Sequence, residues 1–117
     1  MAIGSLHEIV FDCANPEALA RFWQALIGGE VEVESDDWAV LDGDDVGFYI
    51  GFQRVPEHKT AKNRLHLDVE VDDLVSAIDD AEMLGARKIG ELVEEDDGNY
   101  QVMADPGGNE FCFITEE

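Results

Sequence analysis

The stretch that decides the fold is NRLHLDVEVDDLVSAIDDAEMLGA, residues 63–86. Apolar residues alternate with polar ones at Leu67, Val69 and Val71, a period of two that predicts a strand covered on one side. An acidic turn follows, and then apolar residues recur at helical spacing until Gly85, where a helix is expected to end. A similar stretch, LHEIVFDCANPEALARFWQALIGG, occupies residues 6–29. The sequence therefore predicts one strand and helix module that occurs twice.

Three further strands are predicted after each helix, which makes each module βαβββ. In the first module they lie near residues 30–34, 38–41 and 46–52, and in the second near 89, 100–103 and 110–114. Asn15 is the expected N-cap of the first helix, with Pro16 at its first position. The predicted fold class is α+β: one domain over residues 1–117, with modules at about 5–56 and 63–116 and a connector at 57–62. We expect a curved, cup-shaped mixed or antiparallel sheet, with the helices on its convex side.

The charge of the chain is strongly negative and evenly spread. Its 117 residues include 28 acidic residues against 7 Lys and Arg, a formal charge of −21, which argues against nucleic acid or an anionic membrane as a partner. Two cysteines without a CxxC pair and an N-terminal stretch without an apolar signal segment favour a cytoplasmic protein. Dispersed acid beside 45% hydrophobic residues indicates a folded protein adapted to high salt.

Strand parity predicts three metal-ligating side chains on the concave side of the cup. Glu8 and His66 lie on the polar sides of the two opening strands, and Glu110 joins them if Phe111 and its neighbour Phe113 face the helix. Two carboxylates about 4 Å apart repel by about 4 kcal/mol at an effective dielectric of 20, and a divalent cation removes that repulsion. A neutral imidazole with carboxylate oxygens suits Fe, Mn, Ni, Zn or Co.

Neighbouring residues leave alternatives open. His7 replaces Glu8 as the candidate ligand if the first strand is shifted by one residue. Asp68 shares the parity of His66, but in so acidic a chain a solvated strand edge is its expected role. Cys112 follows Glu110 on the same side and is a candidate for the pocket wall.

The doubled βαβββ plan, the NRLHLD strand and the closing DPGGNEFCFI resemble the vicinal oxygen chelate superfamily. This superfamily includes glyoxalase I, extradiol dioxygenases, and fosfomycin- and bleomycin-resistance proteins. The resemblance spans residues 6–115, and the DP-G-NEF phrase is its most specific part. It implies a cup formed by the paired modules, with metal ligands from the first and last strand of each module, and a homodimer.

Carried over by position, the resemblance implies His66, Glu110 and Glu8 as metal ligands, with Glu110 also a catalytic base. The fourth ligand position corresponds to Phe48 in an ungapped alignment of the halves, and to Gln53 in a gapped one. Four further residues are expected either to line the walls of the cup or to pack in the core: Trp38, Tyr49, Tyr100 and Met103.

Two functions follow from the resemblance. The first is divalent-metal-dependent chemistry of the lyase, isomerase or dioxygenase kind on a small oxygen-bearing substrate. The alternative is a non-catalytic protein that sequesters an antibiotic or aromatic compound. Fold alone does not separate the two, because one fold hosts many functions.

Overall fold

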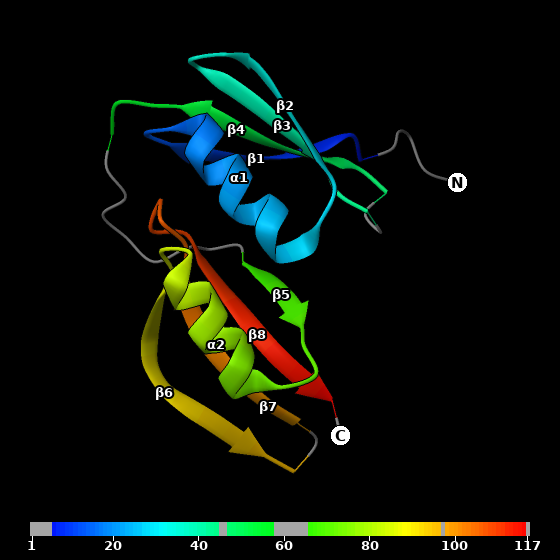
Figure 1. Cartoon of the computed structure of the whole chain (residues 1–117), viewed down its shortest axis with the longest axis vertical. Coiled ribbons are helices and arrows are strands. Elements are labelled where there is room, and N and C mark those ends of the chain that lie inside the picture. The colour runs from blue at the N-terminus through cyan, green and yellow to red at the C-terminus, as the bar shows by residue number, and fades with distance from the viewer. Residues whose placement is uncertain (1–5, 45–46, 58–65, 97, 117) are drawn as a thin grey trace. The chain divides into compact units, whose positions relative to one another are not determined.

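The computed structural model describes residues 6–44, 47–57, 66–96 and 98–116 (Figure 1). The chain forms two compact units, residues 1–58 and 59–117. Within the described residues each unit contains one helix and one four-stranded mixed sheet, which confirms the α+β fold with two βαβββ modules. Apart from Glu57, the predicted connector at 57–62 lies outside the described residues, as do residues 63–65 of the deciding stretch.

The first unit has its strands in the order β1-β4-β3-β2. Its elements are β1 Glu8–Cys13, α1 Pro16–Ile27, β2 Glu30–Ser35, β3 Trp38–Asp42 and β4 Tyr49–Arg54. β1 and β4 are parallel, and the other pairs are antiparallel. The last strand was predicted at 46–52 but runs from Tyr49 to Arg54, because its pairing with β1 begins where Glu8 lies opposite Tyr49.

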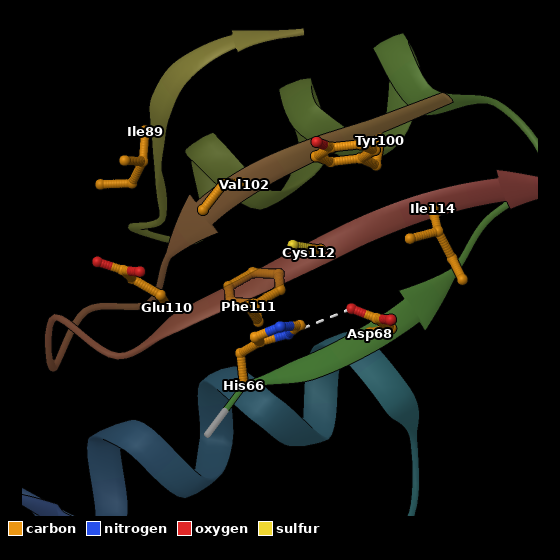
Figure 2. Close-up of a pocket in the computed structure, with 9 residues that line it drawn as sticks. All are labelled: His66, Asp68, Ile89, Tyr100, Val102, Glu110, Phe111, Cys112 and Ile114. Carbon is orange, nitrogen blue, oxygen red and sulfur yellow. Dashed lines mark ion pairs between the residues drawn. The ribbon is translucent and has the colours of Figure 1, made fainter. Parts of the chain in front are cut away.

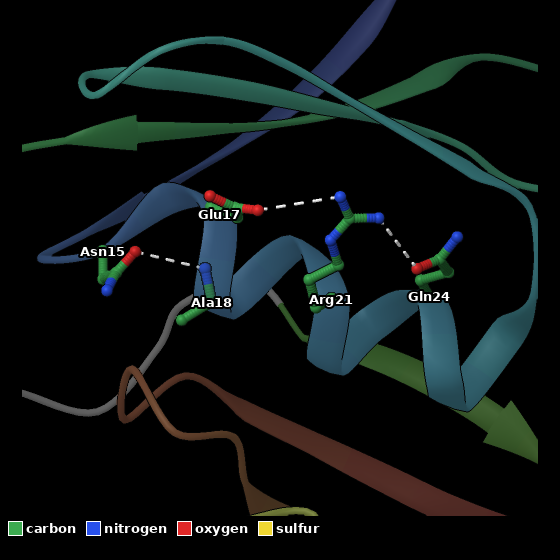
Figure 3. A network of polar contacts seen from close by, with 5 residues as sticks. All are labelled: Asn15, Glu17, Ala18, Arg21 and Gln24. Carbon is green, nitrogen blue, oxygen red and sulfur yellow. Dashed lines mark hydrogen bonds and ion pairs between the residues drawn. The ribbon is translucent and has the colours of Figure 1, made fainter.

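Helix α1 begins where the sequence predicts. The Asn15 side chain accepts a hydrogen bond from the Ala18 backbone N–H at 3.1 Å, and Pro16 is the first helical residue (Figure 3). Pro is favoured there because its missing N–H would have no helical partner. On the exposed side, Glu17 and Arg21 form an ion pair at 3.6 Å, an interaction that contributes little to stability.

The core of the first unit lies between α1 and one face of its sheet. Phe22 and Trp23 of α1 are 5% and 1% exposed, and α1 contacts β2, β3 and β4. The Phe11 ring meets the rings of Trp23 and Phe52 edge-on, each at a centroid distance of 5.6 Å. Such edge-to-face pairs add about 0.5–1.5 kcal/mol each beyond the burial of their area.

The second unit repeats this plan with the strand order β5-β8-β7-β6. Its elements are β5 Leu67–Glu70, α2 Leu74–Met83, β6 Arg87–Glu95, β7 Gly98–Ala104 and β8 Glu110–Glu116. Asp73 caps α2 by accepting from the Ser76 N–H at 3.3 Å, and α2 contacts β6, β7 and β8. Phe111, Phe113 and Met103 are at most 1% exposed and belong to the core of this unit.

Each helix therefore packs against one face of its own sheet (Figure 1). In the part of the chain that the structure describes, no helix is long and apolar enough to cross a membrane.

Candidate functional site

The parallel ladder between β5 and β8 positions the polar side chains of the second unit. Leu67 lies opposite Phe111, and Asp68 lies opposite Cys112. His66 comes one residue before Leu67, and Glu110 comes one residue before Phe111. Since side chains alternate along a strand, all four polar residues fall on the face away from the buried Phe111 and the half-buried Leu67.

A cleft of about 510 Å³ lies on this face, a volume typical of small-molecule sites (Figure 2). Part of its wall is apolar and comes from β6, β7 and β8. Polar side chains of β8 and of the start of β5 complete it. Its lining residues are His66, Asp68, Ile89, Tyr100, Val102, Glu110, Phe111, Cys112 and Ile114.

Three metal-ligating side chains converge beside this cleft. His66 Nδ1 lies 3.3 Å from Asp68 Oδ1, an ion pair whenever the imidazole is protonated. One donor atom each from His66, Asp68 and Cys112 lie within 4.8 Å of one another, and no other group of this kind occurs among the described residues. His66 and Asp68 are 53% and 51% exposed, so the donors are accessible from solvent. Nitrogen, oxygen and sulfur donors of this kind fit a transition metal better than Ca²⁺ or Mg²⁺.

Glu110 lines the same cleft but lies outside this three-residue cluster. The turn before it is ordered by Asp105, whose carboxylate accepts hydrogen bonds from the Gly107 N–H at 2.9 Å and the Asn109 N–H at 2.8 Å. Asp105 is only 3% exposed. The DPGGNE phrase thus fixes the backbone from which Glu110 starts β8.

The ladders of the two units identify which residues correspond. Ile9 and Leu67 are equivalent positions of the two opening strands. Ile9 pairs with Ile50 and Leu67 pairs with Phe111, so residues of the two last strands correspond at an offset of 61 (111 − 50). The equivalent of Glu110 is therefore Tyr49 (110 − 61), and neither Phe48 nor Gln53 as the alignments predicted. The equivalent of Cys112 is Gly51 (112 − 61).

Gln53 corresponds instead to the apolar Ile114 (114 − 61) and lies opposite Asp12. Together with Trp38 it lines a separate polar cleft of the first unit. Its role as a fourth ligand stays a prediction.

Glu8 occupies the open face of the first unit beside Trp38. A Cβ atom added at Gly51 would lie 2.5 Å from Glu8 Oε2 and 3.1 Å from Trp38 Cζ2. The missing side chain at position 51 therefore gives the Glu8 carboxylate and the indole their space. Tyr49 is 40% exposed, and its ring contacts the His7 ring edge-on at 5.3 Å.

Of the predicted wall residues, Tyr100 and Cys112 line the cleft of the second unit, whereas Met103 is fully buried. Asp68 is 51% exposed, as expected of a solvated edge residue, and its carboxylate lies beside His66. Its position two residues after His66 was the available signal, because a parallel strand places both side chains on one face. By the same alternation, Ile114 lies two residues after Cys112 on the face of β8 that lines the cleft.

Two units of strand, helix and three strands, each with an open sheet face, define a glyoxalase-like protein. The family model of the glyoxalase-like domain matches residues 8–114, and the chain belongs to this family. No protein with a curated description is significantly similar to it in sequence.

Several solved structures share the fold. A glyoxalase/bleomycin resistance protein/dioxygenase family enzyme from Burkholderia phytofirmans is 21% identical with a TM-score of 0.74, covering 97% of this chain and 100% of that one. The fosfomycin resistance protein FosX of Listeria monocytogenes is 12% identical with a TM-score of 0.76, covering 99% and 96%. The bleomycin-binding protein of Streptomyces verticillus, solved with copper(II)-bleomycin, is 19% identical with a TM-score of 0.62, covering 99% and 100%.

Proposed function

We propose that the protein binds a divalent metal ion and uses it to act on a small, oxygen-bearing substrate held in the cleft of the second unit. The proposal rests on one observation: His66 and Glu110 line the same cleft, and part of the wall of that cleft is apolar. Members of the vicinal oxygen chelate superfamily commonly use divalent metals, which agrees with this donor chemistry.

The donor set fits such an ion. His66 offers a neutral imidazole nitrogen and Glu110 a carboxylate, and a ligand pair of this type suits Fe, Mn, Ni, Zn or Co. When bound, the metal supplies Lewis-acid polarisation of a substrate oxygen.

The protein residues have three tasks in this proposal. Tyr100 and Ile89 of the apolar wall exclude water and orient the carbon skeleton of the substrate. The Glu110 carboxylate would accept a proton from a substrate carbon that lies next to an oxygen and return it later in the reaction. The Asp105 turn keeps Glu110 in place, because it fixes the backbone immediately before β8.

Thermal unfolding of the metal-free protein tests this function. At a metal concentration 100 times Kd, binding stabilises the folded state by about 2.7 kcal/mol, which raises Tm by several degrees. We expect one of Mn²⁺, Ni²⁺, Fe²⁺, Co²⁺ or Zn²⁺ to give this shift, and both His66→Ala and Glu110→Ala to reduce it. The exposed Glu91→Ala on β6 is the matched control and should keep the full shift.

The alternative is a non-catalytic binder of a small apolar or aromatic molecule. The apolar side chains of the cleft favour it, and one structural neighbour is described as binding bleomycin. A purified protein without stoichiometric metal, whose Tm no metal raises, would favour the binder and contradict metal-dependent chemistry. Saturable quenching of tryptophan or tyrosine fluorescence by an aromatic ligand would then identify the binding activity.

A further inference from the structure

We propose that Cys112 is a metal ligand, and that together with His66 and Asp68 it forms a thiolate-containing site for Zn²⁺ or Co²⁺. This inference rests on the proposed function, because it names the metal class and donors of the same cleft. It differs in one respect that an experiment can separate. Asp68 and Cys112 replace Glu110 as the coordinating anions, so Glu110 is left to contact the substrate and its substitution is no longer expected to reduce metal binding.

The strand register brings these donors together. Asp68 lies directly opposite Cys112 in the parallel ladder, and neighbouring strands lie about 4.8 Å apart. His66 precedes Asp68 by two residues and shares its face. Figure 2 shows the three side chains on β8 and at the start of β5, with the contact between His66 and Asp68 drawn as a dashed line.

The distances are close to those of a coordinated ion. Zinc bonds of about 2.0–2.1 Å to nitrogen, 2.0–2.2 Å to oxygen and 2.3 Å to sulfur place tetrahedral donors about 3.3–3.6 Å apart. His66 Nδ1 and Asp68 Oδ1 are 3.3 Å apart. All three donors lie within 4.8 Å, so the Cys112 sulfur has to approach by at most about 1.5 Å. A side-chain rotation supplies such a movement.

Charge and donor type favour this assignment. A carboxylate and a thiolate beside a neutral imidazole carry two negative charges, which a divalent cation neutralises beside the apolar wall of the cleft. Thiolate sulfur selects zinc-like metals over Mg²⁺, Ca²⁺ or Mn²⁺. Three protein ligands leave a fourth tetrahedral position open for water or substrate, as in catalytic zinc sites.

The first unit provides an internal comparison. The opening strands correspond at an offset of 58 (67 − 9), so Glu8 and Val10 occupy the places of His66 and Asp68. Gly51 occupies the place of Cys112. The first unit therefore has a donor side chain, Glu8, at only one of the three positions, and the proposed site belongs to the second unit alone.

Cobalt absorption tests the proposal directly. The metal-free, reduced protein is titrated with Co²⁺ alone, and we expect a near-ultraviolet charge-transfer band from a Co²⁺–thiolate bond that saturates at one equivalent. Cys112→Ser should abolish the band, and His66→Ala should weaken Co²⁺ binding. Cys13→Ser is the matched control, because Cys13 is a buried cysteine of the first unit, and it should leave the band intact.

Glu110→Gln separates this inference from the function proposed above. If the band and its affinity survive in Glu110→Gln, the thiolate site is supported. If metal binds stoichiometrically without a thiolate band and Glu110→Gln removes it, the thiolate site is wrong and the metal-dependent function stands. If no metal binds at all, both are wrong.

A second measurement keeps the test independent of the Cys112→Ser variant. In the Cys13→Ser background, the alkylation rate of Cys112 by iodoacetamide is measured with and without Zn²⁺. At a Zn²⁺ concentration ten times Kd, about nine-tenths of the sites are occupied, so we expect alkylation to slow about tenfold. An unchanged rate at a Zn²⁺ concentration that saturates metal binding would overturn the proposal.

Discussion

Asp105 is a buried carboxylate that depends on the backbone of its own turn. Its oxygens accept hydrogen bonds from the N–H groups of Gly107 and Asn109 and from the Asn109 side-chain amide. Hydrogen bonds to a charged group contribute about 1.5–3 kcal/mol each, because a buried charge is costly without them. The carboxylate therefore ties the DPGGNE turn to the strand that carries Glu110.

Replacing this carboxylate is expected to destabilise the protein. Asp105→Ala leaves the part-buried N–H donors of Gly107 and Asn109 without their acceptor, so the free energy of unfolding should fall by about 2–4 kcal/mol. Urea denaturation followed by circular dichroism measures the change. Asp36→Ala, at an exposed turn position of the first unit, is the control and should stay within about 0.5 kcal/mol of the parent. An equal loss in both variants would contradict the argument.

Single residues also define how far the sequence alone predicts the site. Strand parity was sufficient to place His66 and Glu110 on the face of the cleft, because the buried Phe111 and Phe113 fix the faces of β8, and their role as metal ligands stays a prediction. The position of Asp68 beside His66 was not predicted, since one carboxylate in a chain with 28 acidic residues has no distinguishing pattern. Its proximity to His66 depends on side-chain rotamers, which alternation along a strand does not specify.

At the scale of elements, the irregular pairing of β6 with β7 depends on one buried amide. The register shifts between Ile89 and Val93, and Gly90 adopts a φ of +74° within β6. Gln101 is 1% exposed, and its side-chain nitrogen lies within 3.3 Å of the carbonyl oxygens of Ile89 and Gly90 and donates to that of Val102 at 2.9 Å. This amide satisfies backbone carbonyls that the disrupted ladder leaves near the core.

Gln101→Leu tests the role of this amide at nearly constant volume. We expect the free energy of unfolding to fall by about 1–3 kcal/mol, because part-buried carbonyls lose their donor. Hydrogen exchange of the β6 amides, residues 87–95, should accelerate more than that of β1. Gln53→Leu, at an exposed position of β4, is the matched control. Unchanged β6 exchange in Gln101→Leu would show that the bulge does not need the amide.

The elements themselves were largely predictable. The start of the first helix followed from Asn15, whose side chain accepts from the Ala18 N–H as a cap does. The acidic turn marked the start of the second helix, where Asp73 is the residue that caps it. The register of β4 was mispredicted. A long acidic turn precedes β4, and the alternation of apolar residues does not show at which residue of that turn the first module differs in length from the second. The pairing of Glu8 with Tyr49 settles that question and makes Tyr49 the counterpart of Glu110.

At the scale of the whole molecule, charge is the dominant feature. A net charge of −21 on 117 residues destabilises a compact state through self-repulsion. Salt weakens that repulsion, since the screening length falls from about 30 Å at 0.01 M to about 3 Å at 1 M. Adaptation to high salt stays a prediction, as do the homodimer, which light scattering would measure, and a cytoplasmic location.

Salt dependence of unfolding measures this repulsion. At pH 7 the Tm should rise substantially between 0.01 M and 1 M KCl, because the carboxylates are then ionised. Near pH 4.1, the isoelectric point of the sequence, the same salt step should have a much smaller effect. A salt-independent Tm at pH 7 would count against halophilic adaptation.

The parallel strand pairs also set the order in which the molecule is assembled during synthesis. Ile9 pairs with Ile50 and Leu67 with Phe111, contacts that span 41 (50 − 9) and 44 (111 − 67) residues. Such distant contacts form slowly, since a long loop must close before they stabilise anything. On the ribosome, the first unit can complete its sheet while the second is still being translated. His66, by contrast, meets Cys112 only after β8 has emerged, so metal loading of the proposed site is a late step in the life of the nascent chain.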